Sequence, residues 1–202
     1  MAKRTGEKYE AILDAAVKVI AENGYHQAQV SRIAKEAKVA DGTIYLYFNN
    51  KEDVLISLFS EKMGKFIDDA TEQLSHYDSP SEQLYHLIRL HFENLEQDPQ
   101  LAIVTQIELR QSNPAIRQEL GTILKKYFAL IDSVIQFGIE TGLFRSDLDI
   151  RVARKMIFGT LDETASSWIM NDRKYRLVDQ IEPIHQLFVG GMGKREPVGV
   201  SR

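Results

Sequence analysis

The sequence contains no cysteine, few glycines and prolines, and no long uninterrupted apolar run. Its 202 residues include 12 glycines, 5 prolines and 1 tryptophan, whereas 44% of the residues are hydrophobic. Without cysteine, the chain forms neither disulfides nor zinc–thiolate sites and has no thiol nucleophile. No stretch approaches the roughly 18 apolar residues of a membrane span, and no apolar segment follows the basic residues near Met1. We therefore expect a cytoplasmic, globular protein with no membrane partner.

Charge is distributed unevenly along the chain. The net charge is −4. Residues 1–51 contain eight Lys and Arg against six Asp and Glu, whereas residues 52–98 contain three against eleven. A polyanion would be repelled by the second segment and accepted by the first. The charge pattern thus keeps nucleic acid open as a partner of the N-terminal part.

Apolar residues recur at helical spacing throughout, and no run alternates for long enough to predict a sheet. Polar residues that can cap a helix precede prolines or carboxylates at Asn50, Ser79, Asp98 and Asn113. The sequence therefore predicts an all-α fold of about nine helices. We expect the helices at residues 8–23, 29–37, 41–47, 51–75, 80–96, 99–111, 114–141, 150–171 and 177–192. Because Pro183 lies inside the last range, that helix is either kinked there or begins later.

Residues 29–48 fit two short helices joined by a tight turn. Ile33 and Ala34 give the first helix a buried face, and Ile44 and Phe48 do so for the second. In a helix-turn-helix the second helix enters the major groove, where hydroxyl and methyl groups can contact base edges. The glycine in this helix allows close approach of the backbone to DNA. The candidate DNA-binding residues are Ser31, Arg32, Lys38, Gly42, Thr43, Tyr45, Leu46, Tyr47 and Lys51.

Two other classes of protein fit less well. His86 and His91 are five residues apart, and the sequence has no nucleophile motif and no Gly-rich phosphate loop, which disfavours an enzyme. A helical interaction protein that does not bind DNA would share the composition, but it would leave the pattern from Gly42 to Lys51 unexplained. We expect no enzymatic activity, no metal and no cofactor.

The stretch from Gly24 to Lys51, with Val39 and the run Gly42–Phe48, resembles the TetR family of regulators. The resemblance implies a homodimer with a helix-turn-helix domain at residues 1–50. A helical domain for ligand binding and dimerisation is implied at 51–193, followed by a flexible tail at 194–202. Three positions depart from the family pattern. Gln29 and Ala40 stand where a capping Ser or Thr is usual, so Asp41 is expected to cap instead, and Lys38 stands where Gly often makes the turn.

Residues 101–113 and 156–160 are similar to the fatty-acid-degradation regulators of this family in Bacillus, which release DNA on binding long-chain acyl-CoA. The similarity implies a repressor of fatty-acid-degradation genes with long-chain acyl-CoA as its effector. Such a ligand needs an apolar tunnel for its tail and cations for its phosphates. A repressor of a multidrug efflux gene, sensing a drug-like ligand, is the alternative. The candidate ligand-binding residues are Phe59, Met63, Phe66, Leu95, Val104, Ile107, Phe128 and Ile131 for the tail, and Arg89, Arg110 and Arg117 for phosphates.

The last two predicted helices combine apolar and small residues, which allow helices to pack closely. A two-fold dimer built on them would hold two recognition helices about one DNA turn or more apart, which requires a palindromic operator. The same side chains would also fit the core of a single chain. The candidate interface residues are Met156, Leu161, Trp168, Leu187, Phe188 and Gly191.

Overall fold

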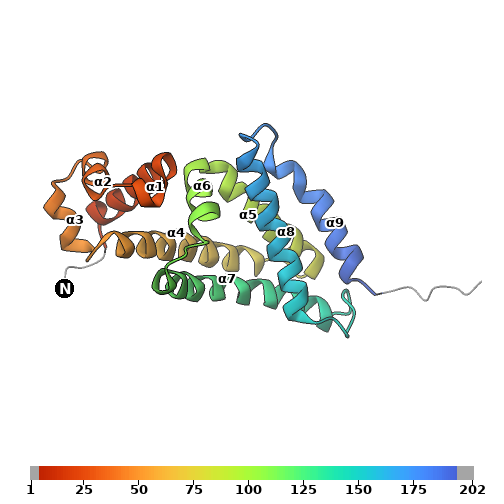
Figure 1. The fold of residues 1–202 in the computed structure, drawn as a ribbon. Coiled ribbons are helices and arrows are strands. Elements are labelled where there is room, and N and C mark those ends of the chain that lie inside the picture. Colours follow the sequence, from red (N-terminus) through yellow and green to blue (C-terminus); the bar gives the residue numbers. More distant parts are fainter. Residues whose placement is uncertain (1–4, 195–202) are drawn as a thin grey trace, which may run out of the picture. The chain divides into compact units, whose positions relative to one another are not determined.

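The computed structural model describes residues 5–194, and this part of the chain is almost entirely helical (Figure 1). The predicted all-α class and the nine α-helices are confirmed for these residues, and the only strand-like feature among them is an isolated bridge between Phe144 and Gly193. Of the predicted tail, only Lys194 is described. The helices are α1 (Glu7–Gln27), α2 (Val30–Glu36), α3 (Asp41–Tyr47), α4 (Lys51–Leu74), α5 (Pro80–Gln97), α6 (Pro99–Glu108), α7 (Pro114–Glu140), α8 (Ile150–Met170) and α9 (Ile181–Met192), with a 3-10 turn, η1 (Leu177–Gln180), before α9.

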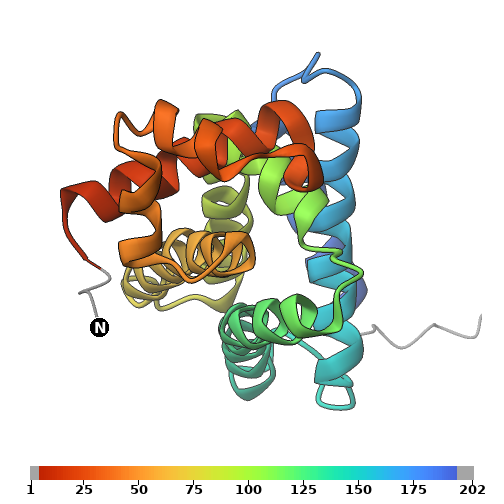
Figure 2. The ribbon, with the colours of Figure 1, turned by 60° about the vertical axis from the view of Figure 1, so that its left-hand side comes forward.

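The described residues form two compact units that do not coincide with the two predicted domains. The first unit contains the described residues up to Phe66 together with Asp98–Leu124, and the second contains Ile67–Gln97 and the described residues from Lys125 to Lys194. α4 and α7 therefore each contribute to both units. The predicted domains at 1–50 and 51–193 stay a prediction; by its contacts, α6 groups with α1–α3 and packs against α1 (Figure 2).

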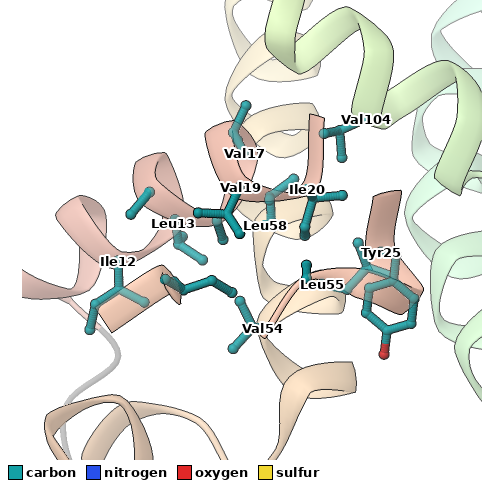
Figure 3. Close-up of a cluster of buried hydrophobic side chains, with 14 of the residues drawn as sticks. Ile12, Leu13, Val17, Val19, Ile20, Tyr25, Val54, Leu55, Leu58 and Val104 are labelled. Carbon is teal, nitrogen blue, oxygen red and sulfur yellow. The ribbon is translucent and has the colours of Figure 1, made fainter. Parts of the chain in front are cut away.

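The first unit is built around α1, whose apolar side chains recur at steps of three and four residues. Ile12, Leu13 and Ile20 belong to the same buried cluster as Leu55 and Leu58 of α4 (Figure 3). Val104 of α6 joins the same cluster. Because the helix-turn-helix is too short to bury its own apolar face, this shared core fixes its geometry.

The second unit is organised around α5, which packs against α8, η1 and α9. Leu84, Leu87, Ile88 and Phe92 are fully buried along one face of α5. Trp168 of α8 is also buried, and its Nε1 donates a hydrogen bond to the carbonyl oxygen of Tyr175 at 2.8 Å. This unit therefore has a core of its own.

The structure resolves the question about the last helix. The backbone passes through η1, and α9 begins only at Ile181, so Pro183 occupies the first turn. In the first turn of a helix the amide has no partner within the helix, and proline is tolerated without a kink. The helix begins later than residue 177, which is one of the two alternatives that the sequence allowed. No described helix combines the length and the hydropathy that a membrane span requires.

Candidate nucleic-acid interface

The inner faces of α2 and α3 are buried as the sequence predicts. Ile33 and Ala34 of α2 and Ile44 of α3 are inaccessible to solvent, as is Phe48 just after α3. The ring of Phe48 stacks on that of Tyr9 with 5.3 Å between centroids. These contacts hold α3 against α1, so the opposite side of α3 is directed away from the core.

The side of α3 that faces away from the core carries candidate DNA-binding residues. Tyr45 is 59% exposed and Leu46 is 66% exposed, and Gly42 is also exposed. Thr43 and Tyr47 are half-buried, and the ring of Tyr47 lies 6.2 Å from that of Tyr9. None of these side chains is sealed in the core, so each remains a candidate for contact with DNA.

The turn between α2 and α3 contains a residue in the left-handed conformation, at the position where the family often has Gly. Lys38 has φ 55°, and its side chain is exposed. The next amide, that of Val39, donates to the carbonyl oxygen of Ala34 and closes the turn. Glycine adopts this conformation readily, whereas lysine does so at a cost of order 1 kcal/mol.

The prediction that Asp41 caps α3 is wrong. Asp41 is the first residue of the helix, Ala40 occupies the N-cap, and no side-chain cap hydrogen bond forms. The carboxylate instead lies in the first turn, where the helix dipole favours a negative charge. The N-cap of α2, Gln29, likewise makes no side-chain cap bond.

Lys51, at the start of α4, is held by the end of α1. Its Nζ donates to the carbonyl oxygens of Tyr25 at 3.0 Å and His26 at 3.1 Å, and lies 4.6 Å from the centroid of the Tyr25 ring. An ammonium has three N–H donors, so these two bonds leave one to reach a phosphate. Lys51 also borders an open hollow of about 440 Å³ that is lined by His26, Ala28, Gln29, Val30, Ser31, Asp41 and Tyr45.

The two candidates on α2 are both exposed. Ser31 borders the same hollow as Lys51. Arg32 donates from Nη1 to Oδ1 of Asn23 on α1 at 2.5 Å, so its guanidinium is already oriented by a neighbouring helix. The structure therefore brings Ser31, Tyr45 and Lys51 together around one hollow.

A buried carboxylate that the sequence did not single out links α6 to α1. Glu108 Oε1 accepts a 2.9 Å hydrogen bond from the backbone amide of Tyr25, and Oε2 accepts from Nε2 of Gln111. Glu108 is only 7% exposed. Burial also raises the pKa of the Tyr25 phenol to about 12. The backbone amide of Tyr25 thus donates to Glu108, and its carbonyl oxygen accepts from Lys51, two residues before α1 ends.

Two of the three arginines proposed to bind phosphates are already engaged. Arg110 is exposed, and its Nη1 donates to the carbonyl oxygen of Gln106 at 2.9 Å, near the end of α6. Arg89 donates from Nε to Nδ1 of His86 at 3.0 Å and lies 3.6 Å from a carboxylate oxygen of Glu93. Arg117 is exposed on α7.

The tail-binding candidates are divided between the two units. Phe59 and Val104 are buried in the core of the first unit, and Leu95 and Ile131 in that of the second. Met63, Phe66 and Phe128 are half-buried, and Ile107 is exposed. Burial of this kind fits core packing as well as a tunnel wall, so the assignment stays a prediction.

Inside the second unit, His91 and Tyr127 form a buried polar pair. The Tyr127 hydroxyl and His91 Nδ1 are 3.0 Å apart, and the two rings are stacked with 5.7 Å between centroids. Burial lowers the pKa of His91 to about 4 and raises that of Tyr127 above its usual range. The imidazole is therefore neutral at physiological pH.

The proposed interface residues divide into three that are buried and three that are exposed. Leu161, Trp168 and Phe188 are buried in the core of the second unit. Met156, Leu187 and Gly191 are exposed, together with Val152, which the sequence analysis omitted. The apolar exposed positions of α8 and α9 are the better candidates for a dimer interface.

Comparison with known proteins identifies the family. Residues 12–58 match the model described as bacterial regulatory proteins of the tetR family, and residues 59–191 match the model of the C-terminal region of YsiA-like protein. The chain belongs to the TetR family of bacterial regulatory proteins. TetR-family membership makes it a transcriptional regulator.

The TetR-family relatives include proteins similar over nearly the whole chain. The chain is 54% identical over 190 residues to the fatty acid metabolism regulator protein of Bacillus subtilis, covering 94% of this chain and 98% of the relative. A solved structure of FadR from Bacillus halodurans, a fatty acid degradation regulator, is 56% identical with a TM-score of 0.88. A structure of the transcriptional regulator FadR from B. subtilis in complex with stearoyl-CoA is 55% identical with a TM-score of 0.89. Each structural match covers 91% of this chain and 99% of the other.

Proposed function

We propose that this protein is a homodimeric repressor that binds a palindromic operator through α3 and releases it on binding a long-chain fatty acyl-CoA, controlling genes of fatty-acid degradation. The observation that carries the proposal is the near-complete match, at 55% identity, to the B. subtilis regulator crystallised with stearoyl-CoA. The exposed face of α3 supports the DNA-binding part. Such a regulator acts on DNA rather than as an enzyme, and its place is the cytoplasm.

The proposed DNA contacts divide by chemistry. Thr43, Tyr45 and Leu46 of α3 meet base edges or adjacent phosphates, and Gly42 lets the helix approach closely. Ser31, Lys38 and Lys51 contact the phosphate backbone, which sets register and affinity without reading sequence. Arg32 and Tyr47 are the remaining candidates for contact with DNA.

For the effector, the apolar candidates would accept the acyl chain, while Arg89, Arg110 and Arg117 supply cations for the phosphates of CoA. Among these, Arg117 has an exposed guanidinium on α7. Met156, Leu187 and Gly191 would form the dimer interface.

Release of DNA follows from different affinities of the effector for two conformations. α6 is suited to pass on such a change, because Glu108 at its last turn holds the amide of Tyr25 near the end of α1. Any shift of this turn would move the chain that leads into α2.

Operator binding should be measured by fluorescence anisotropy while stearoyl-CoA, free CoA, stearate or a cationic dye is added. Native mass spectrometry of the purified protein would identify a co-purified ligand. We expect stearoyl-CoA to release the DNA, whereas free CoA, stearate and the dye should leave it bound. Release by the cationic dye without release by stearoyl-CoA would support the multidrug alternative and overturn the effector assignment.

A further inference from the structure

The recognition helix α3 lacks the side chains that make paired hydrogen bonds with bases. Its seven residues, Asp41–Tyr47, include no Arg, Lys, Asn or Gln. Those four side chains make the paired hydrogen bonds that distinguish guanine or adenine in the major groove. Readout by α3 must therefore depend on other chemistry.

Amide side chains directly after α3 do not fill this gap, because they are committed to the start of α4. Asn49 donates from both its backbone amide and Nδ2 to Oδ2 of Asp53, at 2.9 and 2.8 Å. Asn50 Oδ1 accepts from the amide of Asp53 at 2.8 Å. These bonds close the first turn of α4 and hold both asparagines in place.

The geometry of α3 places Leu46 nearly opposite its buried face. Ile44 is 1% exposed and marks the inner face. Gly42 and Leu46 lie two positions before and after Ile44, so at 100° per residue both stand almost opposite to it and one turn apart. Gly42 adds no side chain here, which leaves Leu46, 66% exposed, as the side chain of α3 that points most directly away from the core.

A leucine side chain can neither donate nor accept a hydrogen bond, so its favourable contact with a base edge is apolar. Thymine is the base that presents a methyl group, at C5, in the major groove. From this geometry we propose that Leu46 reads the C5 methyl group of a thymine in each operator half-site and is a residue that determines specificity. This inference rests on the proposed DNA binding through α3 and adds the chemical group that α3 recognises.

Burying one methyl group contributes roughly as much as one methylene, which corresponds to about a fourfold change in affinity. Tyr45 flanks Leu46 on the same exposed side and can reach a phosphate through its hydroxyl. The contact to the methyl group therefore supplies discrimination between bases, whereas the phenol supplies affinity that is independent of sequence.

The test begins with selection of bound duplexes from a random-sequence DNA library by the full-length protein. Each thymine of the selected operator is then replaced by uracil, which removes the methyl group and leaves all hydrogen-bonding groups unchanged. For the native protein we expect about a fourfold loss of affinity at one thymine position per half-site, and about fifteenfold when both half-sites are substituted.

The matched variants are Leu46→Ala and Leu46→Met. Leu46→Ala should bind the thymine operator about as weakly as the native protein binds the doubly substituted uracil operator, and should lose nothing further with uracil. Leu46→Met retains an apolar side chain and should keep the sensitivity to the methyl group. Thermal unfolding of both variants should match that of the native protein, because the side chain is exposed.

The outcomes separate the two claims. Selection of a defined operator whose affinity does not change with uracil at any position, or a Leu46→Ala variant that keeps the full sensitivity, would overturn the role of Leu46 and leave the proposed function standing. Failure to select any sequence would overturn the DNA-binding function itself, and the inference with it.

Discussion

The outward face of α3 and the pair α8–α9 were both predicted from sequence as contact surfaces. The two differ in how many of their predicted contact residues are exposed in the structure. On α3, Tyr45 and Leu46 are exposed as expected. On α8 and α9, Leu161, Trp168 and Phe188 are buried within the unit, whereas Met156 and Leu187 are exposed. A short motif in which each position has a fixed role predicts which side chains face outward. A long amphipathic helix only predicts which side chains are covered, and both a core and a partner can cover them.

The sharpest way to test this difference is to truncate one buried and one exposed residue of the proposed interface. Trp168→Ala should lower the free energy of unfolding by about 3–5 kcal/mol, because it removes a core side chain that is 3% exposed. Leu187→Ala should cost less than about 1 kcal/mol, because the side chain is 73% exposed.

Urea denaturation at two protein concentrations would measure both effects, and sedimentation would report association. Leu187→Ala should weaken the dimer while leaving the secondary structure intact. If Trp168→Ala instead weakened association without destabilising the fold, the assignment of Trp168 to the core would be wrong.

The second unit should also carry a pH dependence that arises from His91. The folded-state pKa of His91 is lowered to about 4, against 6.5 for an unburied histidine. The unfolded chain binds the proton more tightly, so the stability from neutral His91 is complete above about pH 6.5 and is lost as the pH falls towards 4. Linkage gives a total of about 3 kcal/mol. Urea denaturation between pH 7 and 4 should show a steeper decline in the native protein than in His91→Gln, and parallel declines would refute the effect.

In the first unit, Glu108→Ala tests whether α6 supports the end of α1. Loss of the carboxylate leaves the buried amide of Tyr25 without its acceptor, which should cost about 1–3 kcal/mol of folding stability. Operator affinity should fall as well, because α1 leads directly into α2. Glu119→Ala, an exposed carboxylate on α7, is the matched control and should change neither quantity. Equal operator affinities for the two variants would show that α6 does not support the DNA-binding surface.

The smallest expected effect concerns the turn before α3. Lys38→Gly relieves a left-handed lysine and should raise the free energy of unfolding by about 1 kcal/mol. If Lys38 contacts a phosphate, the slope of log affinity against log salt should fall by about 0.9 for each Lys38 lost. The control is Lys35→Ala, since a glycine at this position would interrupt α2. A destabilised Lys38→Gly variant would contradict the strain assigned to this turn.

Sequence patterns predicted most of the fold because local chemistry marks the helices. Pro80, Pro99 and Pro114 each begin a helix as predicted. Sequence could not predict that α6 groups with α1, because the contact between Glu108 and Tyr25 joins residues 83 positions apart. Glu108 was overlooked since a carboxylate on a helix is usually solvated, although its position between the apolar residues Ile107 and Leu109 is a signal that burial was possible. Sequence likewise could not show that Arg89 and Arg110 form hydrogen bonds with neighbouring groups, because this depends on side-chain positions.

The account depends most on the exposed face of α3, and operator affinity of Tyr45→Ala tests it most directly. Tyr45 is 59% exposed and borders the hollow beside Lys51, so its loss should leave thermal unfolding unchanged. Fluorescence anisotropy with the selected operator should show affinity reduced by at least about tenfold. An affinity equal to that of the native protein would contradict the assignment of α3 as the DNA-reading surface.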